Sequence, residues 1–365
     1  MEKFAFIIHP VHLKRDVARK YPVARFLPEP LVEFLVKKTD PKVVSHITGI
    51  RSKTGAEAEG WFIACPLSPR QFLELDRQFV YDKIIRCGKI AEEIGAKIIG
   101  LGAFTSVVGD AGVTVAENLN IPVTTGNSYT VATAMEGLFE AARLMGVDTP
   151  NATAGVVGAT GSIGQTCTQM LVDRVAKICL IGRNAGKLAK ARDELTSGAT
   201  EVVVSSDIEQ SLPHCDLIVT VSSAVDAIIH PEHLKPGAVI CDVARPRDVS
   251  GEVARVRDDV LIIEGGVVSV PGDVDFGLDF GFPPKTAYAC MSETMMLALE
   301  GMYESFTLGR NITLGQIQRV SQLADKHGFR LAGFRSFEEA VTPERIESVR
   351  KNVQRGRTGS SRGRR

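Results

Sequence analysis

The sequence has no long apolar run and no excess of charge of either sign. No stretch reaches the eighteen or so apolar residues that a membrane-spanning helix needs, and the opening MEKFAFIIHP lacks the apolar region and cleavage site of a secretory signal. The formal net charge is zero, so global electrostatics give no indication of nucleic-acid binding. We therefore expect a cytoplasmic protein with no transmembrane segment and no nucleic-acid partner.

Paired cysteine motifs and histidine clusters are also missing. An odd and dispersed set of cysteines in a large globular chain indicates reduced thiols. The seven histidines form neither an i, i+4 pair nor a cluster with cysteine, so we expect no metal site. The seven cysteines are Cys65, Cys87, Cys167, Cys179, Cys215, Cys241 and Cys290.

The composition is that of a globular protein, with 44% hydrophobic and 24% charged residues in a chain of 365. This length suits two domains, and the alternation of strand-like and helix-like segments predicts an α/β fold with parallel sheet. We expect a smaller α/β substrate-side domain over residues 1–149 and a doubly wound Rossmann domain over 150–284. Helices over 285–337 are expected to cross back over the cleft, followed by a helix and basic tail over 338–365.

The stretch TAGVVGATGSIG, from Thr153 to Gly164, organises the second half. A short run of small and β-branched residues predicts a buried strand, and three glycines then lead into a helical pattern. Strand, glycine turn and helix are the context of a dinucleotide site, whose pyrophosphate lies at the helix N-terminus. A plain strand-to-helix turn is the alternative. The candidate cofactor-binding residues here are Gly158, Thr160, Gly161, Ser162, Ile163 and Gly164.

The next predicted strand ends in the sequence GRN, where NAD-specific folds place an acidic residue. Here Arg183 and Asn184 stand instead, and Lys187 follows one turn later. A cation at this position can pair with a 2′-phosphate, so the sequence favours NADPH as cofactor. An exposed arginine in a surface loop is the alternative.

Further strands are predicted at 201–204, 216–221, 238–242 and 260–263. Because ligands bind at the carboxyl ends of such strands, the residues found there are additional cofactor candidates. They are Ser222, Ser223, Gly265 and Gly266. Asp242 also ends a strand, where it could contact a ligand, but capping of the following turn explains its position equally well.

A helix is predicted from about residue 285 to 305, and Cys290 lies near its beginning. A helix N-terminus lowers the pKa of a thiol, although we expect this position to lie one turn too deep for the full effect. The alternative is that Cys290 is a small hydrophobic side chain buried in the core.

In the first half, strands are predicted at 4–8, 43–50, 60–65 and 97–101, with one long helix from Pro69 to about Ile94.

The last sixteen residues, RKNVQRGRTGSSRGRR, contain seven Lys or Arg and no acid. They are almost without apolar side chains, so the composition predicts a disordered end from Arg350. The alternative is a docking arm for an acidic partner or a membrane surface.

Several short segments together resemble the cyanobacterial acyl-carrier-protein reductases, in order and over about nine tenths of the chain. The segments are LGAFTS (101–106), TTGN (124–127), GATGSIG (158–164), EGG (264–266), AYACMSE (287–293), GRN (309–311) and KHGF (326–329). The loop PGDVDFGLDFGFPP and the extension beyond Phe329 depart from that family, which leaves acyl-chain length and carrier identity open.

The resemblance implies reduction of a fatty acyl thioester, on acyl carrier protein or CoA, to a fatty aldehyde with NADPH. Cys290 would then carry the acyl group, and a downstream aldehyde-processing enzyme would be a partner. Candidate donors to the oxyanion are Thr105, Ser106, Asn127 and Ser128, for which turn capping is the alternative.

Two other functions stay open at this point. One is an NADP-dependent dehydrogenase of the shikimate or amino-acid type, although the Asn-x-Thr-x-Pro-x-Lys segment of shikimate dehydrogenases is missing. The other is a non-catalytic NADP-binding protein.

Overall fold

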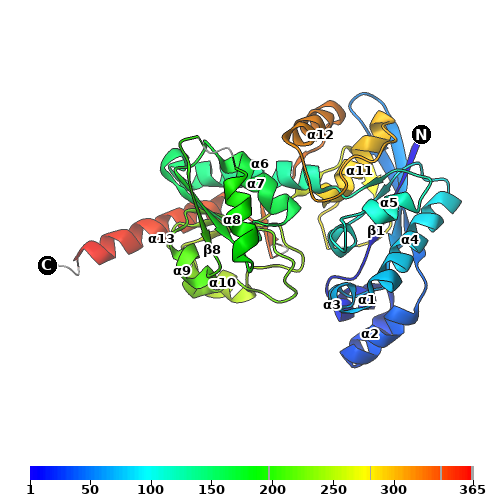
Figure 1. Cartoon of the computed structure of the whole chain (residues 1–365), viewed down its shortest axis with the longest axis horizontal. Coiled ribbons are helices and arrows are strands. Elements are labelled where there is room, and N and C mark those ends of the chain that lie inside the picture. The colour runs from blue at the N-terminus through cyan, green and yellow to red at the C-terminus, as the bar shows by residue number, and fades with distance from the viewer. Residues whose placement is uncertain (196–197, 280, 338, 363–365) are drawn as a thin grey trace. The chain divides into compact units, whose positions relative to one another are not determined.

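A computed structural model describes residues 1–195, 198–279, 281–337 and 339–362 (Figure 1). The chain forms two compact units, each built from two separate segments. Unit 1 consists of Met1–Thr130 and Val268–Ala332, and unit 2 consists of Val131–Val267 and Gly333–Arg365. The α/β fold class expected from the sequence is confirmed.

Unit 1 is built on a mixed six-stranded sheet with the order β13-β2-β3-β1-β4-β5. Neighbours from β3 to β5 run parallel, whereas β2 is antiparallel to both β3 and β13. The carboxyl ends of β1, β4 and β5 therefore meet at one edge of the sheet. The strands are β1 (Glu2–Ile8), β2 (Lys42–Arg51), β3 (Glu57–Ala64), β4 (Ile99–Gly100), β5 (Val123–Thr124) and β13 (Gly272–Asp275).

The helix predicted from Pro69 to Ile94 is two helices, α3 (Pro69–Glu74) and α4 (Arg77–Glu93). Asp76 interrupts the pattern because its carboxylate accepts the Phe79 amide and caps the start of α4. α4 packs on the sheet beside α5 (Val113–Glu117).

In the sequence, three further elements of unit 1 connect β1 to β2: α1 (Leu13–Lys20), the 3₁₀ helix η1 (Pro22–Phe26) and α2 (Glu29–Lys38). Their common core is small, and its buried members are Leu13, Ala18, Ala24 and Val32.

The helix predicted over 285–305 is shorter than expected. Strand β14 (Thr286–Tyr288) comes first, and α11 (Ala289–Glu300) follows it. α11 packs on β1, β3 and β4, and α12 (Leu314–His327) packs on α11. A side chain at Gly100 would meet the Thr294 hydroxyl at 2.1 Å, so this glycine allows α11 to lie close to β4.

Unit 2 contains a fully parallel sheet with the order β11-β10-β9-β6-β7-β8, as the sequence predicted. This is the strand order of doubly wound dinucleotide-binding domains, and the order reverses between β6 and β9. Its strands are β6 (Thr153–Val157), β7 (Lys177–Ile181), β8 (Glu201–Ser205), β9 (Leu217–Thr220), β10 (Val239–Asp242) and β11 (Leu261–Glu264).

The described helices of unit 2 include α7 (Ser162–Leu171) and α8 (Ala185–Asp193), which follow the first two strands of this sheet, and the shorter α9 (Ile208–Ser211) and α10 (Gly251–Val256). Strand interiors such as Ile218 and Ile240 are completely buried, as expected for a sheet of this class.

The boundaries of the two units differ from the expected 149/150, 284/285 and 337/338. The first crossing, between Thr130 and Val131, falls inside α6 (Asn127–Met145). Helix continuity leaves no proline or glycine signal there, which is why composition placed the boundary after the helix instead.

The expectation of disorder from Arg350 is wrong as far as Arg362, because α13 runs from Pro343 to Arg362. Ile346, Val349 and Val353 are buried along one face, and the Asn352 amide donates to the Asp258 carbonyl. Apolar side chains at helical spacing fix this helix on unit 2 in spite of its polar composition. The predicted end at residues 363–365 lies outside the described residues.

Candidate functional site

The glycine turn after β6 has the geometry of a dinucleotide-binding turn. Gly158 has a left-handed φ of +83°, and Gly161 is the N-cap of α7. A side chain at Gly164 would lie 2.3 Å from the Gly158 carbonyl oxygen, so the helix packs against the turn only with glycine there. Thr160 lies in the turn, and Ser162 and Ile163 begin α7.

This turn lies at the point where the strand order reverses. A side chain at Gly158 would meet the Val221 carbonyl and the Ser222 amide at 2.9–3.0 Å, so the loops after β6 and β9 touch. The crevice beside such a reversal is where doubly wound sheets bind nucleotides. Three features fit a dinucleotide here: the glycine turn, the start of α7 at the exposed Gly161, whose N-cap has no side-chain hydrogen bond, and the adjoining loop.

The loop after β7 presents positive charge. Arg183 and Lys187 are exposed, and no carboxylate of the described chain pairs with Arg183. Asn184 caps α8 because its side-chain oxygen Oδ1 accepts the Lys187 amide, so this oxygen has a structural role.

The two serines after β9 differ. Ser222 donates its hydroxyl to Asp248 at 2.5 Å, whereas Ser223 is exposed. Asp248 also accepts the Ser222 amide and the Thr220 hydroxyl, and burial raises the pKa of its carboxyl in spite of these donors. Ser222 is thus held in place by Asp248.

Asp242, at the end of β10, caps its own loop. Its two oxygens accept the amides of Ala244 and Val249, and burial raises the pKa of this carboxyl to about 7. The turn-capping alternative for Asp242 is the one that the structure supports.

The glycines after β11 serve packing and turning. A side chain at Gly265 would meet the Val243 methyl at 2.7 Å, and Gly266 has φ +79°. The preceding Glu264 is buried and forms ion pairs with Arg245 and Arg247.

Cys290 differs from the other six cysteines in exposure and position. It is half-buried while the others are buried, and burial raises the pKa of five of those thiols. Because α11 begins at Ala289, Cys290 lies in the first helical turn. It is therefore not one turn too deep, and the helix N-terminus favours a thiolate there.

Cys290 packs directly against the loop that follows β5. A side chain at Gly126 would meet the Cys290 Cα at 2.3 Å and its Cβ at 2.4 Å, and Gly126 has φ +73°. Two buried side chains flank this glycine, Thr125 and Asn127. Within the described residues, neither the Thr125 hydroxyl nor the Asn127 amide nitrogen has a hydrogen-bond partner. Such orphaned polar atoms are uncommon in a protein interior.

The other three oxyanion candidates use their hydroxyls within the fold. Thr105 donates to the Gly102 carbonyl at 2.8 Å, and Ser106 donates to the Ala103 carbonyl at 2.7 Å. Ser128 donates to Glu293 at 2.6 Å. Asn127 is thus the candidate that the fold leaves available for a ligand.

Glu293 is a residue whose importance the sequence did not reveal. It is completely buried, yet four groups donate to its carboxylate: the hydroxyls of Thr124, Ser128 and Thr307, and the Tyr129 amide. It lies one turn after Cys290 and caps the N-terminal turn of α6. This carboxylate therefore ties the helix that carries Cys290 to the helix that begins at Asn127. Only its place in the AYACMSE segment could have drawn attention to it.

His9 supports the neighbouring loop after β4. Its Nε2 accepts the Phe104 amide at 3.2 Å, and its Nδ1 donates to the Pro10 carbonyl at 3.1 Å. Its ring also packs against Phe72 and Phe104. Burial lowers the pKa of His9 to about 4, which keeps the ring neutral and able to accept.

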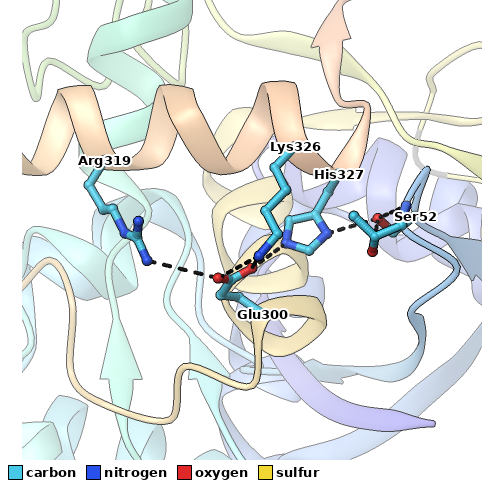
Figure 2. Close-up of polar contacts among 6 residues, drawn as sticks. Ser52, Glu300, Arg319, Lys326 and His327 are labelled. Carbon is cyan, nitrogen blue, oxygen red and sulfur yellow. Dashed lines mark hydrogen bonds and ion pairs between the residues drawn. The ribbon is translucent and has the colours of Figure 1, made fainter.

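A second polar cluster in unit 1 has the residue types of a hydrolytic triad (Figure 2). His327 lies between Ser52, at 2.9 Å from Nδ1, and Glu300, at 3.0 Å from Nε2. Ser52 and His327 are buried, and the Ser52 hydroxyl also accepts the Thr54 amide. The Lys53 amide donates to the His327 carbonyl. The cluster thus fastens the loop after β2 to the end of α12 and leaves Ser52 no access to a substrate.

Within the described chain, no helix combines the length and apolar character needed to cross a membrane. Nor do the described residues contain a group of His, Cys, Asp or Glu suited to a metal ion.

Comparison with known proteins adds three findings. Residues 140–263 match the family model described as shikimate / quinate 5-dehydrogenase. Aminotransferase PigE of Serratia sp. (strain ATCC 39006) is 33% identical over 362 residues, which is 96% of this chain and 42% of PigE. The long-chain acyl-(acyl-carrier-protein) reductase of Synechococcus elongatus is 29% identical over 343 residues, which is 89% of this chain and 98% of the reductase.

This chain thus spans less than half the length of PigE and nearly the whole length of the reductase. Among solved structures, L-tryptophan dehydrogenase from Nostoc punctiforme is 12% identical over 97% of this chain and 89% of its own, with a TM-score of 0.42. The sheet topology of unit 2 and the sequence similarities support an NAD(P)-dependent oxidoreductase.

Proposed function

We propose that this protein reduces a fatty acyl thioester, carried by acyl carrier protein or CoA, to a fatty aldehyde with NADPH. The observation that carries the proposal is the placement of Cys290 in the first turn of α11, against Gly126, whose two neighbours in the chain, Thr125 and Asn127, have orphaned polar side-chain atoms. The similarity to a named long-chain acyl reductase over 98% of its length supports the choice of substrate.

In the first step, the Cys290 thiolate attacks the thioester carbonyl. A new carbon–sulfur bond forms, the bond to the carrier breaks, and the carrier leaves as a thiol after taking up a proton. The negative charge that develops on the carbonyl oxygen needs preorganised donors. We assign this role to the Asn127 amide nitrogen and the Thr125 hydroxyl, because they are buried and have no partner in the described fold.

In the second step, the acyl group on Cys290 accepts a hydride, which NADPH supplies when it is bound. The resulting hemithioacetal collapses, its carbon–sulfur bond breaks, and aldehyde and thiolate are released. The thiolate is a good leaving group, and the N-terminus of α11 stabilises its charge.

The NADPH preference rests on the loop after β7. Residues at the turn from Gly158 to Gly164 would hold the pyrophosphate, and Arg183 with Lys187 would pair with the 2′-phosphate. Ser223 and Ser222 would lie beside the bound cofactor, with Ser222 oriented by Asp248.

A second candidate is an NADP-dependent dehydrogenase of the shikimate or amino-acid type. The match of residues 140–263 to the shikimate / quinate 5-dehydrogenase model favours it, although that match is confined to the dinucleotide-binding region. Such an enzyme transfers hydride directly and does not need Cys290. This chain spans only 42% of PigE, so the aminotransferase activity in that protein's name does not indicate the reaction of this chain.

A covalent-labelling experiment distinguishes these functions. Wild-type protein is incubated with acyl-CoAs of graded length without NADPH, and intact mass followed by peptide mapping locates any adduct. We expect one acyl group on Cys290, and aldehyde when NADPH is then added. Cys290→Ser should fold and bind NADPH but form no adduct, while the matched control Cys179→Ser, at a buried cysteine, should label normally.

An adduct on another cysteine, or wild-type turnover by Cys290→Ser, would contradict the covalent mechanism. Turnover of a hydroxy acid with no reaction on acyl-CoA or acyl carrier protein would favour the dehydrogenase. Comparison of the two acyl donors at one chain length would identify the carrier.

A further inference from the structure

Large exposed apolar side chains are concentrated in one short segment of unit 1. Among the described residues twelve are exposed, and six of these lie between Tyr21 and Leu35. Phe26 is 82% exposed and Val23 is 63% exposed. Clusters of this kind on a folded protein mark interaction sites. The six residues, which we call the 21–35 surface, are Tyr21, Val23, Phe26, Leu31, Phe34 and Leu35.

Helix α2 is apolar on two faces, and the fold uses only one of them. Val32 and Val36 pack into the small core formed with α1 and η1. Leu31, Phe34 and Leu35 are exposed at i, i+3 and i+4, which places them on a common face of the helix. This second face is not part of that small core and stays about half exposed.

The segment that carries this surface is strongly basic. Residues 13–38 contain seven Lys or Arg and three acids, a net charge of +4 in a chain whose formal net charge is zero. Two of the three acids are engaged internally: Asp16 accepts the amides of Val11 and His12, and Glu33 accepts the Ser68 hydroxyl. The charge presented to a partner is therefore positive.

Cations also lie directly beside the exposed rings. The Lys38 ammonium is 4.3 Å from the Phe34 ring centroid, and the Lys42 ammonium is 2.7 Å from the Tyr21 hydroxyl. Aromatic and aliphatic side chains that enter the acyl region, next to cations that meet lipid phosphates, are typical of proteins bound in a membrane interface.

We propose that the 21–35 surface docks the protein peripherally on an anionic lipid bilayer. Charge argues against a second copy as the occupant, because two segments of net charge +4 would repel each other. Six large apolar side chains argue for a lipid surface as the occupant. An acidic protein would bind this basic segment mainly through charge and would need far less apolar contact. The inference does not depend on the proposed reaction, since docking needs neither Cys290 nor NADPH.

The location of this surface is relevant to a lipid-derived substrate. β1 leads from the sheet into α1, and α2 contacts the start of α3 through the hydrogen bond from Ser68 to Glu33 (Figure 1). α3 in turn packs on the loop after β4, where Phe72 stacks on Phe104. The 21–35 surface is thus connected by direct packing to the carboxyl edge of the unit 1 sheet.

Vesicle co-sedimentation of the full chain tests the proposal. We expect binding to vesicles of phosphatidylcholine with 30% phosphatidylglycerol, weakened in high salt and at least about tenfold weaker with phosphatidylcholine alone. Replacing two exposed aromatics, in Phe26→Ser/Phe34→Ser, should weaken binding by about tenfold or more. The matched control Val256→Ser/Leu314→Ser changes exposed apolar residues outside the surface and should bind as wild type.

Three results would overturn the proposal: failure of wild-type protein to bind anionic vesicles, equal binding by the aromatic variant, or an equal loss in the control. A dimer in sedimentation velocity that disappears in the aromatic variant, without vesicle binding by wild type, would identify a second copy as the occupant. Binding of purified acyl carrier protein through the same residues, again without vesicle binding, would identify a carrier-docking surface.

Discussion

Removal of the Glu293 carboxylate should destabilise unit 1 far more than neutralising it. Glu293→Ala leaves four buried donors without their acceptor: three hydroxyls and the amide of Tyr129. An unsatisfied buried donor costs about 1–3 kcal/mol, but hydroxyls can turn to new partners, and the Thr307 hydroxyl already lies 3.3 Å from that of Ser128. We therefore expect a loss of about 4 kcal/mol in the free energy of unfolding.

Glu293→Gln is the informative comparison. Its amide oxygen can still accept the Tyr129 amide and the Ser128 hydroxyl, while its NH₂ group donates to the hydroxyls of Thr124 and Thr307, which can turn to accept. Only the strength that the charge adds to these bonds is lost, and we expect a cost of about 1–2 kcal/mol.

The single tryptophan of the chain, Trp61, lies in β3 and reports on unit 1. Urea unfolding followed by its fluorescence gives the free energy for each variant, with the exposed Glu304→Ala as control. On heating, the Ala variant should melt about 10 °C below wild type and the Gln variant about 3–5 °C below it. If Ala and Gln cost the same, or Ala costs less than about 1 kcal/mol, the carboxylate does not tie α11 to α6 as described.

Gly126→Ala should abolish aldehyde formation, measured by mass spectrometry, because its methyl group would overlap the Cys290 backbone; wild-type turnover would refute the close contact. His9 should make unit 1 acid-sensitive. Its pKa is about 4 when folded against the ordinary 6.5, so below pH 6.5 the unfolded chain binds a proton that the folded chain does not. Stability then falls between pH 6.5 and 4 by at most about 3 kcal/mol, and urea titrations of His9→Gln should show a smaller fall. Arg183→Ala should raise KM for NADPH by about tenfold or more and leave KM for NADH nearly unchanged; an equal change in both would remove Arg183 from the 2′-phosphate site.

The dinucleotide-binding sheet could be predicted because its signals are local. Each strand is a short apolar run, and the glycine turn gives both the start of α7 and the reversal point of the sheet. The basic tail was predicted less well. The helix α13 includes its first part because Val349 and Val353 pack against unit 2, and composition does not reveal such packing.

The candidate site could be predicted only in part, because it depends on contacts between distant segments. Cys290 stood out in sequence, but its contact with Gly126 joins residues 164 positions apart. The same holds for Glu293 and its donors on the loop after β5. Thr105 and Ser106 looked equivalent to Asn127 in the sequence, and only their hydrogen bonds within the loop distinguish them.

The discontinuous make-up of unit 1 has a consequence for its synthesis on the ribosome. The first 130 residues contain five strands of the sheet, whereas α11, which packs on β1, β3 and β4, is not complete until Glu300 has been translated. Every residue of the unit 2 dinucleotide sheet is made in between. The nascent chain therefore holds an uncovered apolar sheet face for the time needed to make some 170 residues, about 9–34 s at a synthesis rate of about 5–20 residues per second. During that interval the N-terminal segment is a natural client for chaperones, and a truncated chain that ends before α11 would expose the same face permanently.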